Sequence, residues 1–256
     1  MIHTGLVSIT FRKLSPEQII ELVVQAGLEG VEWGGDVHVP HGHCEKAGMV
    51  RKMTGDAGLK TASYGSYYRV GHEELLPFES VLETALALRA PVIRVWAGKK
   101  GSAEADDGYF EKIVEDSRRI GELSAREKIK IGYECHGGTL TDTPDSAVKL
   151  LKAVGHENVG SYWQPAVGAT GEVAVKSLQS MLPWLVHVHA FHWRDGAVRC
   201  LLEEGADRWN AYLQTIKSTA RDHFVLMEFV KDDLPGNFLK DAKTLKNWVQ
   251  RIKENR

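Results

Sequence analysis

The sequence has 256 residues, a formal net charge of −2 and 43% hydrophobic residues, a composition typical of a globular protein. No apolar run approaches the roughly 18 residues of a membrane span, and the N-terminus lacks a basic segment followed by an apolar one. We therefore expect a cytoplasmic protein without membrane contacts. The near-neutral charge argues against nucleic-acid binding, and three separated cysteines predict neither disulfides nor a Cys-x-x-Cys metal site.

The N-terminal part of the chain predicts a strand over Gly5–Thr10 followed by a capped helix. Ser15 is placed to cap that helix, with Pro16 at its first position and Gln18 completing a capping box. Gly27 is the expected stop of this helix, because glycine readily takes the left-handed conformation that ends helices.

The rest of the chain continues to alternate between strands and helices. Further strands are expected at Gly30–Trp33, Lys60–Ser63, Pro91–Trp96, Ile129–His136, Asn158–Trp163, Trp184–Phe191 and His223–Phe229. Helices are expected to end near Gly58 and to cover Pro77–Arg89, Asp107–Glu127, Pro144–Val154, Glu172–Leu182, Asp207–Thr219 and Phe238–Lys253. Eight strands alternating with eight helices, with neither a dinucleotide fingerprint nor a phosphate loop, predict one domain over residues 1–256: a single (β/α)₈ TIM barrel.

Several strands carry polar side chains on the face that opposes their apolar face. The strand over Ile129–His136 is unusual as scaffold, because its polar face ends in Glu134 and His136 just before a glycine pair. If the apolar faces meet the helices, the barrel interior receives Glu32, Arg94, Glu134, Gln164, His187, His189 and Glu228. Carboxylate, imidazole and amide groups meeting at strand ends predict a site for a divalent Mn, Mg, Co or Zn ion.

Other interpretations of these residues remain open. Arg94 could be an interior ion-pair partner of a buried glutamate, and His187, one layer deeper than His189, suits a role behind a metal ligand or in the core. Aromatic residues crowd the expected rim and suit stacking on a sugar, with Trp96 among them. His38 is a candidate to face the site, and Arg194 could bind a phosphate or carboxylate group.

Five segments together resemble the xylose isomerase-like TIM barrels, the sugar phosphate isomerase/epimerase superfamily. They are Gly30-Val31-Glu32-Trp33, Ile93-Arg94-Val95-Trp96-Ala97-Gly98, Tyr133–Thr143, His187-Val188-His189 and Met227-Glu228-Phe229. The resemblance implies that Glu134, the strand-six position, His189 and Glu228 bind one divalent ion. The strand-six position is Asp in the family and Gln164 here, which implies weaker metal binding. Epimerases of the family also carry a substrate-binding histidine three residues later, and this chain has Val167 at that position.

The resemblance implies a sugar or polyol isomerase or epimerase that transfers a proton through an enediolate. Glu134 and Glu228 would be the catalytic base and acid, while His136 and His192 orient hydroxyls or relay protons. The expected partner is a small sugar or polyol, and a homo-oligomer is possible.

Three alternatives stay open. The same site could serve an inosose-type dehydratase, or a barrel without enzymatic activity that binds a polyol through a metal-poor site. A third, the family's zinc-dependent hydrolase of abasic DNA, is disfavoured by the missing strand-six acid and the net charge of −2.

Overall fold

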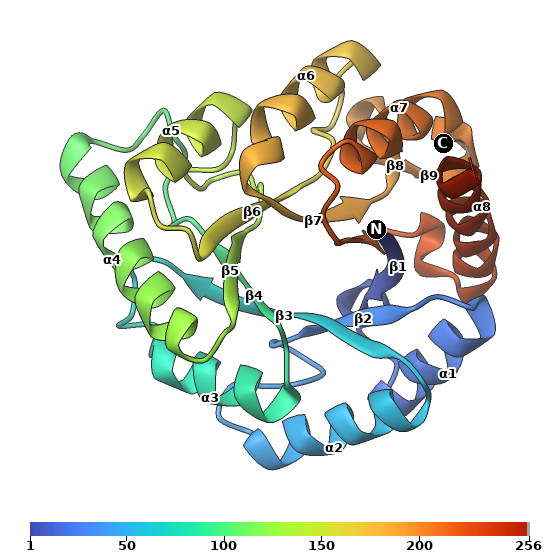
Figure 1. Cartoon of the computed structure of the whole chain (residues 1–256), viewed down its shortest axis with the longest axis horizontal. Helices are drawn as coiled ribbons and strands as arrows, with labels where there is room; N and C mark the ends of the chain where they lie inside the picture. The colour runs from blue at the N-terminus through green and yellow to red at the C-terminus, as the bar shows by residue number, and fades with distance from the viewer. Residues whose placement is uncertain (255–256) are drawn as a thin grey trace.

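Eight parallel strands close into a barrel, and helices surround it on the outside (Figure 1). The computed structural model describes residues 1–254. The barrel strands are β1 (Ile2–Val7), β2 (Gly30–Gly34), β3 (Lys60–Arg69), β4 (Val92–Trp96), β5 (Lys130–Tyr133), β6 (Val159–Trp163), β7 (Leu185–Ala190) and β10 (His223–Met227). Neighbours in sequence are neighbours in the barrel, and β10 pairs with β1 to close it. The predicted (β/α)₈ TIM barrel is confirmed.

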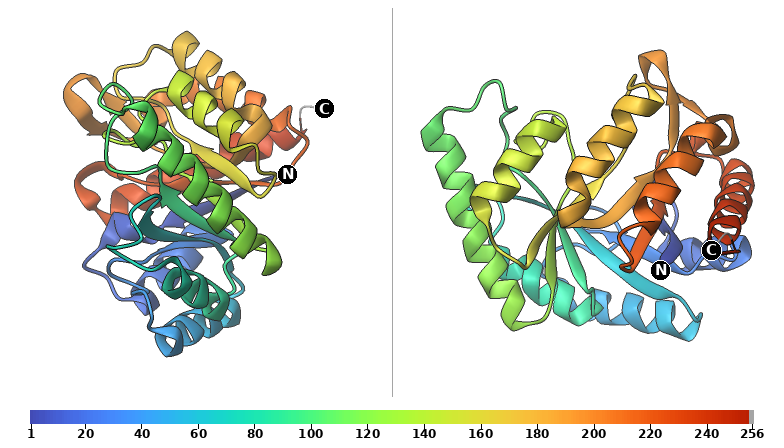
Figure 2. Two further views of the ribbon diagram at one scale, coloured as in Figure 1. Left: turned by 90° about the vertical axis from the view of Figure 1, so that its left-hand side faces the viewer. Right: turned by 45° about the horizontal axis from the view of Figure 1, so that its top comes forward.

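The helices follow the strands in the expected order and form the outer ring (Figure 2). They are α1 (Pro16–Ala26), α2 (Cys44–Asp56), α3 (Phe78–Leu88), α4 (Asp107–Arg126), α5 (Pro144–Val154), α6 (Gly171–Met181), α7 (Ala206–Lys217) and α8 (Pro235–Glu254). The capping box at Ser15 and Gln18 is present, and Gly27 ends α1 with a φ of 64°. Within residues 1–254, no helix is long and apolar enough to cross a membrane.

The first strand and the segment after β7 differ from the expectation. The predicted strand Gly5–Thr10 lies too late, because β1 is Ile2–Val7 and a 3₁₀ helix, η1 (Ser8–Phe11), follows it at once. After β7 the chain forms an antiparallel hairpin of β8 (His192–Arg194) and β9 (Val198–Cys200), which the sequence did not indicate. Short 3₁₀ helices, also unexpected, lie at η2 (Leu182–Trp184), η3 (Asp195–Ala197), η4 (Leu202–Gly205) and η5 (Lys231–Asp233).

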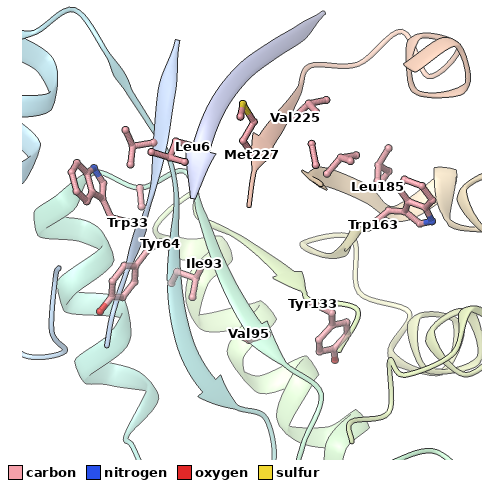
Figure 3. Packing of buried hydrophobic residues seen from close by; sticks show 14 of the residues in the cluster. Leu6, Trp33, Tyr64, Ile93, Val95, Tyr133, Trp163, Leu185, Val225 and Met227 are labelled. Atoms are coloured by element: carbon pink, nitrogen blue, oxygen red, sulfur yellow. The ribbon is translucent and has the colours of Figure 1, made fainter. Parts of the chain in front are cut away.

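The main core lies between the barrel and the helices, as apolar strand faces require. Leu6, Ile93 and Met227, from three barrel strands, are among its buried side chains (Figure 3). Each such side chain contributes roughly 1.5–3 kcal/mol by leaving water. On the opposite strand faces, Gly132 leaves room for the Tyr162 ring, since a Cβ there would lie 2.7 Å from it. This close approach brings Tyr162 beside the polar residues of the barrel interior.

Candidate metal centre

Three potential metal ligands meet at the C-terminal ends of the barrel strands. Each of Glu134, His189 and Glu228 is buried, and they offer ligand atoms that all lie within 4.8 Å of one another. His189 Nδ1 lies 3.2 Å from Glu228 Oε2 and 4.0 Å from Glu134 Oε1. The structure therefore brings together the imidazole and the two carboxylates that the sequence placed on different strands.

Backbone hydrogen bonds fix both glutamates just past the ends of their strands. The amide of Glu134 donates to the carbonyl of Val95 at 2.9 Å, and the Thr141 hydroxyl donates to the carbonyl of Glu134 at 2.6 Å. The amide of Glu228 donates to the carbonyl of Ala190 at 3.0 Å. Because the barrel's hydrogen bonding continues one residue beyond β5 and β10, these carboxylates sit on rigid backbone.

Gln164 lies just after β6 and turns its amide oxygen toward the same centre. Its Oε1 is 3.1 Å from His189 Nδ1, and its Nε2 donates to the carbonyl of Cys135 at 2.9 Å. The second bond assigns the amide orientation, since a carbonyl can only accept. An amide oxygen placed in this way is a suitable ligand for a hard cation.

A buried arginine links the carboxylates of the barrel interior. Arg94 Nε donates to Glu32 Oε1 at 2.7 Å, and the same guanidinium forms an ion pair with Glu134 Oε2. Trp96 Nε1 donates to that Glu134 oxygen at 2.5 Å. Burial alone would lower the pKa of Arg94, but the neighbouring acidic groups, Glu32 first, together raise the pKa. Arg94 is therefore the interior ion-pair partner that the sequence suggested, and Glu134 is held at one oxygen.

The charge and hydrogen bonding of this cluster fit a divalent cation. Glu32, Glu134 and Glu228 are three buried carboxylates, whereas Arg94 supplies one permanent positive charge, so two negative charges are left to balance when His189 is a neutral ligand. Burial lowers the pKa of His189, but the neighbouring carboxylates, Glu228 first, raise it to about 9. Within residues 1–254, Glu228 Oε2 is buried without a hydrogen-bond partner. The donor set therefore suits a hard or borderline ion that takes oxygen and imidazole ligands.

His187 lies one layer below His189 and belongs to the barrel core. Its Nδ1 accepts from the Phe224 amide at 3.2 Å, and its Nε2 lies 3.3 Å from the carbonyl of Ala62. This arrangement requires the neutral ring with its proton on Nε2. Burial lowers the pKa of His187 to about 4. The sequence-based prediction of a core role is confirmed.

A cavity of about 500 Å³ opens above these candidate metal ligands and reaches Glu134, Gln164 and Glu228. Its aromatic lining residues are Tyr67, Trp96, His136, Trp163, Phe191, Trp193 and Phe229. The rings of Trp96 and His136 pack with centroids 4.5 Å apart. The Nδ1 of His136 lies 2.7 Å from the carbonyl of Gly137, to which it must donate, so Nε2 is left for other contacts. Two of the predicted substrate-binding residues, Trp96 and His136, thus line the cavity.

Three other predicted substrate-binding residues do not reach this cavity. His38 is buried, and both its ring nitrogens are occupied, by the Ser8 hydroxyl at 2.9 Å and the Leu14 carbonyl at 3.1 Å. His192 and Arg194 lie on the β8–β9 hairpin and line a different cavity of about 500 Å³, where Arg194 pairs with Glu204. The expectation that these side chains face the metal centre is corrected, because long-range packing of loops decides their direction.

Arg12 is a cavity residue that the sequence analysis missed. It follows η1 in the segment after β1, lines the cavity above the candidate metal ligands, pairs with Asp36 and donates to the Tyr67 hydroxyl at 3.1 Å. The predicted strand over Gly5–Thr10 ends three residues later than β1, so the prediction also placed the start of the following loop too late. An earlier end of that strand would have put Arg12 in the first loop at the catalytic face of a barrel.

Comparison with known protein families identifies the same architecture. The model of the family described as xylose isomerase-like TIM barrel matches residues 20–251, which confirms the resemblance seen in the sequence. A 3-dehydroshikimate dehydratase from Bacillus anthracis is 26% identical over 282 aligned residues, which cover 95% of this chain and 96% of the relative.

Solved structures with the same fold include several named enzymes. A probable 3-DHS dehydratase involved in petrobactin synthesis from Bacillus anthracis has a TM-score of 0.78 at 22% identity, with 96% of this chain and 99% of the other covered. A D-psicose 3-epimerase from Clostridium cellulolyticum has a TM-score of 0.72 at 12% identity, with 98% and 99% covered. A xylose isomerase domain protein from Alicyclobacillus acidocaldarius has a TM-score of 0.78 at 13% identity, with 99% and 100% covered. The curated relative is a dehydratase, which supports the expectation of an enzyme, and the solved structures show the shared fold.

Proposed function

Because this chain belongs to the family of xylose isomerase-like TIM barrels, we propose that it is a divalent-metal-dependent enzyme acting on a small sugar- or polyol-derived carbonyl compound. The reaction begins with removal of the proton on the carbon next to the carbonyl group. The observation that carries the proposal is the meeting of Glu134, His189 and Glu228 at the floor of an aromatic cavity.

Glu134, His189 and Glu228 would hold the ion, with Gln164 Oε1 as a fourth ligand. A bound Mn, Mg, Co or Zn ion supplies Lewis-acid polarisation of a carbonyl and stabilises negative charge on substrate oxygens. Two carboxylates in place of the family's three lower the attraction for the cation. The ligand set therefore favours modest metal affinity.

The two glutamates are not equivalent as proton acceptors. Glu134 Oε2 is engaged by Trp96 Nε1 and by Arg94, whereas Glu228 Oε2 makes no hydrogen bond within residues 1–254 and lies 3.2 Å from a single charged partner, the His189 ring. A carboxylate that already accepts from two donors is a weaker base than one that accepts from neither. Glu228 is therefore the proposed base, and Glu134 is the proposed anchored ligand.

His136 is the proposed partner for substrate hydroxyls. Because its Nδ1–H is committed to the Gly137 carbonyl, only Nε2 is free to exchange a proton in the cavity. A protonated His136 can give that proton to a departing hydroxyl, which leaves as water after Glu228 has taken the carbon-bound proton. This sequence is a dehydration, and we place it first because it needs only one carboxylate as a base.

The 26% identity with a 3-dehydroshikimate dehydratase over nearly the whole chain supports the same choice. Isomerisation or epimerisation is the second candidate. It is favoured by a specific observation, namely that Glu134 and Glu228 both line the cavity and so face the same substrate space. In that reaction one carboxylate removes the proton and the other returns it, with no loss of water.

The cavity lining fits a ring-shaped, hydroxylated substrate. Tyr67 packs edge-on against Trp96 with centroids 5.2 Å apart, and Phe191 and Trp193 pack at 5.0 Å. Such aromatic faces stack on the C–H faces of sugars and cyclic polyols, while the polar groups below them fix orientation. The proposed partner is thus a small molecule.

The test is hydrogen exchange in D₂O with Mn²⁺-loaded protein and a panel of ketoses, aldoses and keto-polyols. Deuterium entering the carbon next to the carbonyl without loss of mass as water indicates isomerisation or epimerisation, and loss of one water indicates dehydration. Glu228→Gln should abolish exchange, whereas His192→Gln, outside the cavity, should retain it. Exchange that survives in Glu228→Gln would contradict the assigned base.

A further inference from the structure

We infer that Glu32 is a positioning residue that fixes the orientation of His189 in the metal centre. This inference rests on the metal-binding function proposed above. Glu32 reaches into the barrel from β2 and is fully buried, and it is not among the residues that line the cavity. A buried carboxylate below a ligand histidine needs a reason, because burial of an unneeded charge is costly.

Two hydrogen bonds hold the Glu32 carboxylate rigidly. Ser63 Oγ donates to Oε2 at 2.6 Å, and Arg94 Nε donates to Oε1 at 2.7 Å. The side chains of Glu32 and Arg94 are 0% and 2% exposed, so water does not compete for these bonds. These two bonds fix the orientation of the Glu32 carboxylate and leave it little freedom to rotate.

The fixed carboxylate faces the ring nitrogen of His189 that points away from the proposed ligands. Glu32 Oε1 lies 3.6 Å from His189 Nε2, and within residues 1–254 this nitrogen is buried without a hydrogen-bond partner. His189 Nδ1 lies on the other side of the ring, 3.2 Å from Glu228. The ring thus stands between a ligand carboxylate and a second carboxylate that is held from below.

Histidine chemistry gives this second carboxylate its function. If Nδ1 binds a metal ion with its lone pair, the proton of the neutral ring must sit on Nε2. Glu32 is the carboxylate placed to accept from that N–H, after a closure of a few tenths of an ångström. Such a partner fixes the tautomer, orients the ring and strengthens Nδ1 as a donor.

Arg94 connects this positioning carboxylate to a second ligand. The same guanidinium that holds Glu32 also pairs with Glu134. Loss of the charge on Glu32 would therefore both free the His189 ring and shift Arg94 toward Glu134. Both changes weaken metal binding, and neither involves contact with substrate.

The first experiment measures Mn²⁺ and Zn²⁺ affinity by calorimetry in the full-length wild type, Glu32→Gln and Ser63→Ala. Glu32→Gln keeps the size of the side chain and removes its charge, and we expect roughly 10- to 100-fold weaker metal binding. Ser63→Ala removes one of the two bonds that hold the carboxylate but keeps its charge and leaves Oε1 facing His189, so its loss of affinity should be smaller than that of Glu32→Gln. Equal affinity in wild type and Glu32→Gln would overturn the inference. Absence of metal binding in the wild type would instead overturn the proposed function.

A second measurement needs no variant and so does not depend on how Glu32→Gln folds. In Zn²⁺-loaded wild-type protein with ¹⁵N-labelled histidine, nuclear magnetic resonance should show His189 bound through Nδ1. Its Nε2 proton should be hydrogen-bonded and slow to exchange with water. A His189 ring bound through Nε2, or an Nε2 proton that exchanges freely, would refute the positioning role.

Discussion

His187 provides a quantitative test of how the barrel interior is built. Its Nδ1 accepts from the Phe224 amide, and its pKa is lowered to about 4 by burial, against an ordinary value of 6.5. The pKa of His187 is lower in the folded protein than in the unfolded chain. Between pH 6.5 and pH 4 the unfolded chain therefore binds a proton on His187 that the folded protein does not bind. The stability associated with a neutral His187 is therefore fully present above pH 6.5 and is lost as pH falls toward 4.

The size of this effect follows from the two pKa values. Linkage gives a loss of about 2 kcal/mol at pH 5 and about 3 kcal/mol once both states are protonated. Replacement by Gln, which keeps an amide donor and acceptor but does not titrate, should remove this part of the pH dependence. A loss of about 2 kcal/mol corresponds to roughly 4–8 °C in melting temperature for a chain of this length.

The assay is urea unfolding of wild type and His187→Gln at pH 7.5 and pH 5.0. The difference between the two pH values should be about 2 kcal/mol larger in the wild type than in the variant. This double difference cancels the cost of the substitution itself and the titration of all other groups. An equal pH dependence in both proteins would refute the claim that His187 is buried neutral.

Three further predictions concern the neighbouring polar groups. Gln164→Asp should tighten Mn²⁺ binding by about tenfold or more, because a charged ligand replaces an amide; unchanged affinity in calorimetry would mean that this position supplies no ligand. Trp96→Phe should lower the free energy of unfolding in urea by about 1.5–3 kcal/mol, since the bond to the Glu134 carboxylate is charge-assisted; no loss would show that the indole N–H is dispensable. Burial raises the pKa of Asp241 to about 6, because the buried carboxyl group favours its neutral, protonated form. The stability that this neutral form contributes is fully present below the ordinary pKa of aspartate and is lost as pH rises through 6. Asp241→Asn, which keeps an acceptor for the Leu202 amide, should be more stable than wild type at pH 7.5, with a difference that shrinks at pH 5; a constant difference across this range would contradict the raised pKa.

The sequence predicts the barrel well because its signals are local. The capping box at Ser15 and the apolar periodicity of the helices depend on neighbours within a few residues. The same alternation correctly put Glu134, His189 and Glu228 on the interior side of their strands. Side-chain direction along a strand is set by the backbone itself, so no knowledge of the partner strands is needed.

The loops above the barrel could not be predicted in this way. The β8–β9 hairpin turns His192 and Arg194 away from the main cavity through pairing within the hairpin and contacts with η4. His38 is drawn into the core by partners about 24 to 30 residues away in sequence. Such long-range contacts leave no periodic trace in the sequence, and they decide which loop residues reach the site.

The most direct test of the metal centre is the metal content of the protein after reconstitution with Mn²⁺, Mg²⁺ or Zn²⁺, measured by elemental analysis. Wild type is compared with a Glu134→Ala, Glu228→Ala double variant whose folding is checked by circular dichroism. About one ion per wild-type chain, and none in the folded variant, is the result that the proposed site predicts. A wild-type protein without bound ion, or a double variant that retains it, would contradict a metal centre formed by these residues.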